Sequence, residues 1–322
     1  MAQRFGGGGF DTTYYRSFKG SIIARVYLAR RYDDLTLAPP GNLQKMSYHA
    51  NNPLSVGLGL TYRSFSASIS KGLNFLKSDS IKGRTQSTDI QLHIYKKKWV
   101  VDAIGEFYKG YYLSAYGLAS PVGNSYYIRP DMGIQTVGVS AYRILNDTRF
   151  SYGAGLSQNA WQQKSAGSFL LGGEAFYVAI NADSALAPRV IDSVYNAENI
   201  HIVHVFEIGP GIGYAYNLVI QKHYFVLASL NANINFRFSR EIGDGISQDK
   251  LGFSPNFILR LGTGYNTNKW SLAFVWVATS IQTEGKASGY EYTITTGNYR
   301  LVYARRIALN SKMKKIIGTD PY

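Results

Sequence analysis

The sequence predicts an all-β protein, a transmembrane antiparallel up-and-down β-barrel of twelve strands. Three observations predict this fold class. Long segments alternate between apolar and polar side chains, the segments beside tight turns carry their apolar side chains on matching faces, and aromatic residues gather near those turns. The composition agrees, because only 17% of the residues are charged and 26 are tyrosine, whereas soluble domains average about 25% charged residues. No segment approaches the roughly 18 consecutive apolar residues of a membrane-spanning helix.

The alternation is clearest over residues 224–239. Every even position there is apolar, and the odd positions from Ser229 onward carry amide, hydroxyl or guanidinium groups. A period of two is the signature of a strand with two different faces. Strands of soluble sheets usually have about five or six residues, whereas a tilted strand needs about 9–11 residues to cross a bilayer. The length of this segment therefore favours a membrane barrel.

Paired strands must carry the side chains of one face opposite each other. We tested this at tight turns around residues 63–64, 97–98, 146–147, 217–223 and 266–269. At all five turns the apolar side chains before the turn match in parity those after it. The third turn contains Asn146-Asp147, a pair that suits a type I′ turn. This third hairpin would join residues 132–145 to residues 148–161.

With both chain ends on the side of the short turns, twelve strands follow. Pro53 interrupts the second of them as a bulge or break. Residues 168–180 also alternate, and form either a loop hairpin above the membrane or extra strands that make the barrel fourteen. We prefer twelve because residues 181–200 supply no partner strand. The predicted strands are 20–33, 43–62, 65–74, 86–96, 99–112, 132–145, 148–161, 202–216, 224–239, 252–265, 270–284 and 291–307. The long connections at the opposite, extracellular end are 34–42, 75–85, 113–131, 162–201, 240–251 and 285–290.

The chain divides into a flexible N-terminal segment (1–18), a single outer-membrane barrel (19–308) and a basic C-terminal tail (309–322). Ala2-Gln3 resembles the residues left around a signal-peptidase cut, so we expect a mature exported chain whose signal peptide is removed. There is no cysteine, which excludes disulfides, thiolate metal sites and a lipid anchor on cysteine.

Aromatic residues with outward parity lie near the short turns and predict a girdle at the membrane interface. The predicted girdle is Tyr62, Phe65, Trp99, Phe150, Tyr152, Tyr216, Tyr224, Tyr265 and Trp270.

Inward parity predicts a polar lumen. Buried charges must be paired or hydrated, so the lumen is either plugged and cross-linked by ion pairs or forms a narrow solute channel. A barrel of twelve strands lies between the filled and the open types, so its size leaves both open. The predicted lumen residues are Arg25, Asp89, His93, Asp102, Glu106, Glu207, Asn231, Asn233, Asn235, Arg237, Arg260 and Arg300.

A two-residue turn at Lys97-Lys98 would place His93 opposite Asp102 and Asp89 opposite Glu106. Opposed carboxylates repel each other unless a cation, a shared proton or an arginine intervenes. We expect Arg25 or another lumen arginine to neutralise them, and we predict no metal ion and no cofactor.

No motif of an established enzyme class is present, such as a GxSxG elbow, an HExxH pair or a phosphate-binding loop. His204 has lipid-facing parity without a serine that can be shown beside it. We predict that the protein is not an enzyme, with a membrane-embedded lipid-modifying enzyme as one alternative. A second alternative is an accessory subunit that binds another envelope protein through loop 162–201.

The net charge is +14, yet the basic residues do not form one stripe. They lie at turns, in loops and in the tail, which favours contact with anionic lipids and lipopolysaccharide and not with nucleic acid. The basic turn residues are Arg63, Lys96, Lys97, Lys98, Lys222 and Lys269.

Five sequence blocks occur in the order found in one family: RVYLARRYDDLTL, SYHANNPLSVGLGLTYRSFSASIS, ILNDTRFSYGAG, QQKSAGSFLLGG and GPGIGYAYN. Over residues 20–305 the chain resembles the outer-membrane family of Bacteroidota known as domain of unknown function 4421. The resemblance implies an exported outer-membrane β-barrel of a Gram-negative bacterium, and it implies no activity.

Overall fold

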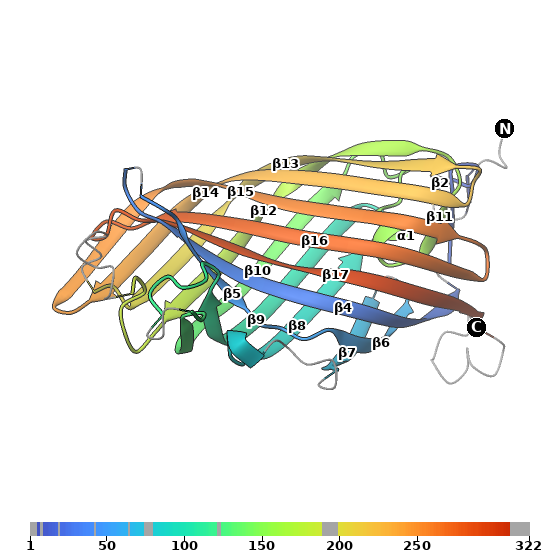
Figure 1. Ribbon diagram of the computed structural model, residues 1–322. Helices are drawn as coiled ribbons and strands as arrows, with labels where there is room; N and C mark the ends of the chain where they lie inside the picture. The colour runs from blue at the N-terminus through green and yellow to red at the C-terminus, as the bar shows by residue number, and fades with distance from the viewer. Residues whose placement is uncertain are drawn as a thin grey trace.

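The computed structural model describes residues 5–6, 9–18, 20–41, 43–63, 65–73, 80–120, 124–188 and 199–309. Over these residues the chain forms an antiparallel barrel with oblique strands (Figure 1). The wall consists of β4 (Ser21–Ala38), β5 (Met46–Ala50), β6 (Ser55–Tyr62), β7 (Phe65–Gly72), β8 (Gln86–Tyr95), β9 (Trp99–Leu113), β10 (Ile128–Ile144), β12 (Ala166–Asn181), β13 (Ile202–Ile220), β14 (Tyr224–Gly243), β15 (Ile246–Asn266), β16 (Trp270–Glu284) and β17 (Glu291–Ala308).

The wall closes on itself among the described residues. The thirteen segments belong to one sheet, and β4 pairs with both β5 and β6. These two segments are halves of one interrupted wall strand, so the barrel has twelve strands, as predicted. The break falls at residues 51–54 and contains Pro53, which confirms the predicted interruption.

Apolar side chains cover the outer face of the wall. Ile212, Leu230 and Ile234 are 66%, 51% and 68% exposed, while the inward neighbours of Leu230 and Ile234 on β14 are buried. A water-soluble protein rarely exposes apolar surface on this scale, whereas a lipid-facing barrel wall requires it. Among the described residues, no helix is long and apolar enough to cross a membrane.

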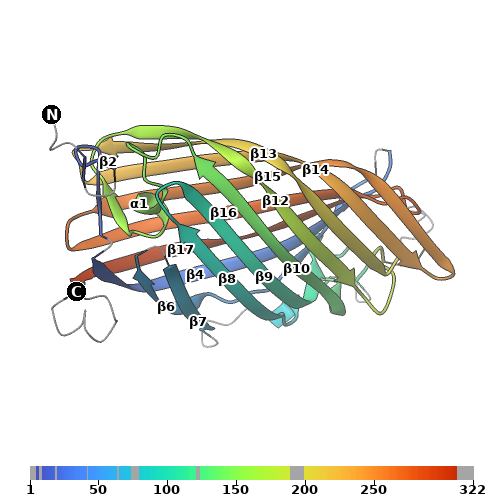
Figure 2. The same ribbon diagram turned by 180° about the vertical axis from the view of Figure 1, so that it is seen from behind.

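The hairpin pairing confirms four of the five tested turns. Leu60 lies opposite Ala67, and His93 lies opposite Asp102. The hairpins β13–β14 and β15–β16 also keep the predicted parity, since Tyr216 faces Ala228. These short turns lie at the end of the barrel where β4 begins and β17 ends (Figures 1 and 2). We call this the turn end, and the opposite end the loop end.

The predicted strand at 148–161 is wrong. Residues 145–165 turn into the barrel, where they form the short helix α1 (Tyr152–Leu156) and strand β11 (Ala160–Gln162). Every residue from 152 to 162 is buried. A wall strand cannot have this pattern, because alternate side chains would face lipid. The main chain at Asn146 makes a helical turn, in which the Phe150 amide donates to the Asn146 carbonyl at 3.0 Å.

The wall strand beside β10 is β12, from the segment that the sequence left open as a loop hairpin or as extra strands. Val139 pairs with Ala175 and Val137 with Tyr177. On its other side, β12 pairs with β13 along its whole length. Strand β12 therefore takes the place predicted for residues 148–161, and the total remains twelve wall strands. The predicted loop 162–201 accordingly contains a full wall strand.

Residues 10–18, predicted to be a flexible segment, pack against this inward chain. Strand β3 (Tyr15–Ser17) pairs with β11, and Tyr15 is buried. Two shorter strands, β1 (Phe5–Gly6) and β2 (Phe10–Asp11), form a separate hairpin. A 3-10 turn, η2 (Ser80–Lys82), precedes β8. The predicted tail beyond residue 309 lies outside the described residues.

The revised pairing can be tested by cross-linking, because the chain has no cysteine of its own. Val139→Cys with Ala175→Cys is expected to form a disulfide on mild oxidation of the folded barrel, since directly opposed residues lie within disulfide range. Val139→Cys with Ala154→Cys, the pair required by the predicted hairpin, is expected to remain reduced. Non-reducing gels would report both results, and the reverse outcome would restore residues 148–161 to the wall.

Candidate functional site

The interior of the barrel is the candidate functional site. All twelve predicted lumen residues have inward positions on their strands, and most of them are buried. They come from seven wall strands: β4, β8, β9, β13, β14, β15 and β17. The pairing register that sets strand parity therefore also brings these polar groups together.

An ion-paired cluster crosses the middle of the lumen. Asp102 on β9 accepts from Arg260 Nη2 on β15 at 2.5 Å and lies 2.6 Å from His93 Nδ1 on β8. Tyr95 donates its hydroxyl to the same carboxylate at 2.9 Å. Arg260 also donates to Asn231 on β14 at 3.2 Å. Because β9 and β15 lie on different sides of the barrel, this cluster links opposite walls.

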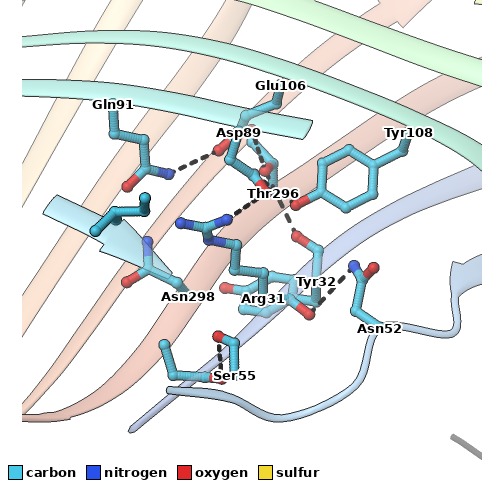
Figure 3. Close-up of polar contacts among 12 residues, drawn as sticks. Arg31, Tyr32, Asn52, Ser55, Asp89, Gln91, Glu106, Tyr108, Thr296 and Asn298 are labelled. Carbon is cyan, nitrogen blue, oxygen red and sulfur yellow. Dashed lines mark hydrogen bonds and ion pairs between the residues drawn. The ribbon is translucent and has the colours of Figure 1, made fainter. Parts of the chain in front are cut away.

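Asp89 lies opposite Glu106, and each of the two carboxylates has its own hydrogen-bond partners (Figure 3). Arg31 Nη1 lies 2.5 Å from Asp89 Oδ2, and the Tyr108 hydroxyl donates to Asp89 at 2.7 Å. Glu106 accepts from Gln91 Nε2 at 3.1 Å and from the Thr296 hydroxyl. Arginine thus neutralises one carboxylate of the pair, while neutral donors satisfy the other.

Arg25 does not take the role that the sequence allowed it. Its guanidinium lies over Gly59 on β6, and its buried Nε has no hydrogen-bond partner among the described residues. Arg31 is the arginine that meets Asp89. Parity could have identified Arg31, because it shares the inward positions of Arg25 on one strand. Among the described residues, the hydrogen-bond partners of Arg300 are the neutral side-chain oxygens of Asn298 and Gln91.

A second network joins β12, β13, β14 and β15. Glu174 accepts from the side-chain amides of Asn233, Asn235 and Asn256, each at 2.8–2.9 Å. Glu207 accepts from Asn256 and from the Ser254 hydroxyl. The sequence did not identify Glu174, because residues 168–180 were left outside the preferred wall.

The inward chain closes the turn end, and we call residues 145–165 the plug. It bonds to three separate hairpin turns: Asn159 donates to the Arg63 carbonyl, Trp161 to the Lys222 carbonyl, and Arg306 bridges the carbonyls of Gln158 and Thr267. The Tyr152 hydroxyl of the plug also donates to Ser229 on wall strand β14 at 2.8 Å. A five-residue helix is not stable alone, so contacts with the wall hold α1 in place.

The N-terminal strand β3 fastens the plug from outside. Tyr15 donates its hydroxyl to the Asp147 carbonyl at 3.1 Å. Burial, and then the nearby Asp147 carboxylate, raises the pKa of the Tyr15 hydroxyl well above its ordinary range. This hydroxyl therefore remains a donor at any physiological pH.

An apolar cluster fills the loop end. It includes Leu35, Tyr111, Ile134, Val178 and Ile294, all at most 1% exposed. Residues 182–188 fold inward to join it. Arg129 donates to the carbonyls of Ser184 and Ala185 at 2.9 and 2.7 Å, and the Tyr48 hydroxyl donates to the Leu186 carbonyl at 2.6 Å. Between plug and cluster, a cavity of about 40 Å³ beside His93 and Arg260 remains, room for about three waters.

The predicted girdle needs one correction. Phe150 and Tyr152 are 0% and 1% exposed and lie inside the barrel as part of the plug. Their segment is not a wall strand, so the alternation of its side chains does not indicate which of them face outward. Outer-face positions hold for the other members, such as Phe65 and Tyr224, which are 58% and 52% exposed. Their place at a membrane interface remains a prediction.

The histidines differ in their surroundings. His204 lies opposite Ala179 and Arg240, so its strand neighbours include no serine. His93, in contrast, lies opposite Ser66 on β7. Ser66, His93 and Asp102 therefore form one inward-facing row across three adjacent strands. The Ser66 hydroxyl bonds to the Thr61 hydroxyl at 2.8 Å. Among the described residues, no three His, Asp or Glu side chains are grouped to hold a metal ion.

Comparison with known proteins gives a family and several distant barrels. The model of the family described as domain of unknown function (DUF4421) matches residues 10–305. No curated protein matches the sequence. Among solved structures, the outer membrane protease OmpT from Escherichia coli is 6% identical, covering 89% of this chain and 97% of that chain, with a TM-score of 0.42.

Two further structures are similar at the same level. The β domain of the Bordetella autotransporter BrkA is 9% identical over 88% of this chain and 99% of that chain, with a TM-score of 0.37. The toluene transporter TbuX of Ralstonia pickettii is 11% identical over 88% and 89%, with a TM-score of 0.29. The strand pairing of this chain establishes its barrel independently.

The Asp102–Arg260 pair is expected to contribute strongly to the stability of the folded barrel. Replacing only one partner, as in Arg260→Met, leaves the Asp102 carboxylate buried without its arginine and should cost about 3–5 kcal/mol. Asp102→Asn combined with Arg260→Met should recover most of this loss. Denaturant unfolding of the four proteins in detergent measures the coupling. Additive effects of the two substitutions would contradict a direct link across the lumen.

Proposed function

This chain belongs to the DUF4421 family, and we propose that it is a closed barrel of the outer membrane whose interior is a structural core. In this proposal it acts as an anchor or accessory component of the envelope, and its polar lumen is not a solute channel. We include in the proposal a Gram-negative source among the Bacteroidota, which the ordered sequence blocks support.

The observation that carries the proposal is the closure of the lumen at two levels in series. The plug bonds to three turns around one mouth, and the apolar cluster with residues 182–188 fills the other. Ion pairs such as Asp102–Arg260 join the walls between them. A passage for solute would require both closures to move and the wall-to-wall pairs to separate.

The outer face supports a location in a membrane. Exposed apolar side chains cover the wall, while basic residues such as Lys98 and Lys222 lie at the turn end. Cations at this level favour anionic headgroups. We propose outer-membrane lipids and lipopolysaccharide as contacts of the barrel, with a second envelope protein as its functional partner. Loop 162–201 offers less surface for that partner than the sequence suggested, because β12 and residues 182–188 belong to the wall and core.

A second candidate function is supported by the row of Ser66, His93 and Asp102. The order of a nucleophile, a base and an orienting carboxylate is that of an esterase. Ser66 would attack the carbonyl carbon of an acyl ester, His93 would take the serine proton and pass it to the leaving alcohol, and water would release the acid. Ser66 lies where β7 and β8 stop pairing, because only Phe65–Ile94 and Ser66–His93 are matched. Asp102, however, is also held by Arg260, which favours the structural role.

The closed lumen predicts electrical silence. The refolded, heat-modifiable barrel in a planar bilayer is expected to give no steady conductance steps, because both mouths are filled. An open-lumen barrel in the same membrane serves as the positive control. Salt-dependent steps that change on Glu106→Ala would refute the closed barrel and support a channel.

Thiol labelling gives an independent test of the same closure. Ser140→Cys lies in the middle of the lumen, where the serine is 4% exposed, and is expected to resist a water-soluble maleimide. Ser247→Cys, at an exposed position at the loop end, should react readily under the same conditions. Equal labelling rates would mean that water and solute reach the interior freely.

The esterase candidate is tested with a phospholipid whose acyl chain carries a fluorophore. If the row is catalytic, Ser66→Ala and His93→Ala should lower hydrolysis about a thousandfold or more. Ser68→Ala, at the next inward position of β7, is the matched control and should retain the rate. Absent hydrolysis in the unaltered protein, or equal rates in Ser66→Ala and Ser68→Ala, would eliminate this candidate.

A further inference from the structure

The barrel wall splits between β15 and β16 at the loop end. Pairing between these strands begins at Phe257–Ser280, so residues 246–256 of β15 pair only with β14. Strand β16 continues instead with β17 to the pair Glu284–Glu291. Figure 1 shows the β14–β15 hairpin diverging from β16 at this end. The split contains a pocket of about 330 Å³, a size that small-molecule sites have.

Arg237 forms part of the pocket wall and lies on the inner face of β14. Its side chain is almost fully buried, with the residue 6% exposed, and its Nε has no hydrogen-bond partner. No ion pair involving Arg237 occurs among the described residues. Its strand neighbour Glu207 directs its carboxylate to Ser254 and Asn256 on β15 instead. Arg237 is therefore a buried cation that makes no hydrogen bond or ion pair with the part of the chain that the structure describes.

Two further features accompany this arginine. Gly252 lies opposite it on β15, where a Cβ atom would come within 2.9 Å of Arg237 Nη2. The bare glycine leaves room for the guanidinium beside the pocket. Thr283, which also lines the pocket, is 1% exposed, and its hydroxyl has no partner. An arginine and a threonine thus offer unused hydrogen-bond donors in the same cavity.

Part of the remaining pocket wall is apolar, and one side is fixed. Pro39, Pro40, Pro255 and Phe253 line it. The turn between β16 and β17 is held against β14 by Glu241, which accepts from the Ala287 amide at 2.7 Å and from the Ser288 and Tyr292 hydroxyls. The pocket does not depend on a free loop for its shape, because this carboxylate ties the turn to the wall.

Two carboxylates occur among the lining residues. Glu284 forms an ion pair with Lys250 at 2.8 Å, and Glu291 lies opposite it on β17, where it is exposed. They disfavour negative charge at their side of the pocket, whereas Arg237 favours it at the buried side. A ligand with one acidic group and an uncharged remainder matches this distribution.

We propose that this pocket binds a small monocarboxylic acid from the medium at the loop end. The carboxylate pairs with the guanidinium of Arg237 and accepts from Thr283. The ring or short apolar body of the acid packs against Phe253 and the three prolines. Arginine presents parallel N–H donors that match a carboxylate in two-point contact, so the unused donors of Arg237 are suited to this group.

The experiment measures binding of hippurate to the full-length barrel in detergent by calorimetry. Hippurate has a benzoyl group and one carboxylate, and hippuramide is its neutral counterpart. We expect hippurate to bind, hippuramide to bind at least about tenfold more weakly, and Arg237→Gln to weaken hippurate binding by a similar factor. Arg240→Gln is the matched control, because Arg240 lies on the outer face of the same strand and pairs with Asp249. It should leave binding unchanged.

Stability separates a ligand-binding arginine from a structural one. Without ligand, Arg237→Gln should keep or raise the denaturant midpoint of unfolding, because no internal hydrogen bond is lost and a buried charge is removed. Gly252→Leu, which fills the space beside the guanidinium, should block hippurate binding in a folded barrel. The proposal is overturned if hippurate does not bind, if it binds Arg237→Gln and Arg240→Gln equally, or if Arg237→Gln destabilises or fails to fold.

Discussion

Polar groups inside this barrel are shielded from bulk water, so each needs a hydrogen-bond or ion-pair partner within the protein. The arrangement of the interior follows from these partnerships. A buried charge costs free energy unless a partner of opposite charge or several hydrogen bonds accompany it. Asp102 meets this requirement through His93 and Tyr95 on β8 and through Arg260 on β15. Glu174 meets it through three asparagine amides. Each carboxylate therefore links strands that are not paired through their backbones. The buried charges thus act as cross-links between separate parts of the wall.

The width of a twelve-stranded barrel explains the plug and the inward fold of residues 182–188. Eight strands leave an interior that wall side chains can fill, whereas twelve leave more space. This chain fills that space with its own backbone at both ends. Backbone placed inside must have its polar groups bonded, and this is where Arg129 and Arg306 act. Both are buried arginines that donate to main-chain carbonyls, Arg129 to residues 184–185 and Arg306 to residues 158 and 267.

The sequence could predict the wall because lipid imposes a simple rule on it. Outward positions must be apolar, so parity identified strands such as β14 and the register that sets His93 opposite Asp102. The same rule has no force inside the barrel. Residues 148–161 alternate in sequence but lie inside the barrel, where side chains on both faces are buried. In the wall, β12 occupies the position that the alternation predicted for them. Parity also cannot tell which inward arginine meets which acid, since Arg25 and Arg31 share a face and only Arg31 reaches Asp89.

Arg260 and Arg237 show how the same residue type acquires different roles on one inner surface. Arg260 lies where β15 pairs on both sides, and the opposite wall supplies Asp102 within 2.5 Å. Arg237 lies where β15 has left β16, so the neighbouring strand that would carry a partner is displaced and a pocket takes its place. Its nearest strand neighbour, Glu207, is already satisfied by Asn256 and Ser254. The interior otherwise satisfies most of its charges. Arg25 also has a buried Nε without a hydrogen-bond partner among the described residues, whereas at Arg237 the unused donors coincide with a split in the wall that admits a ligand from outside.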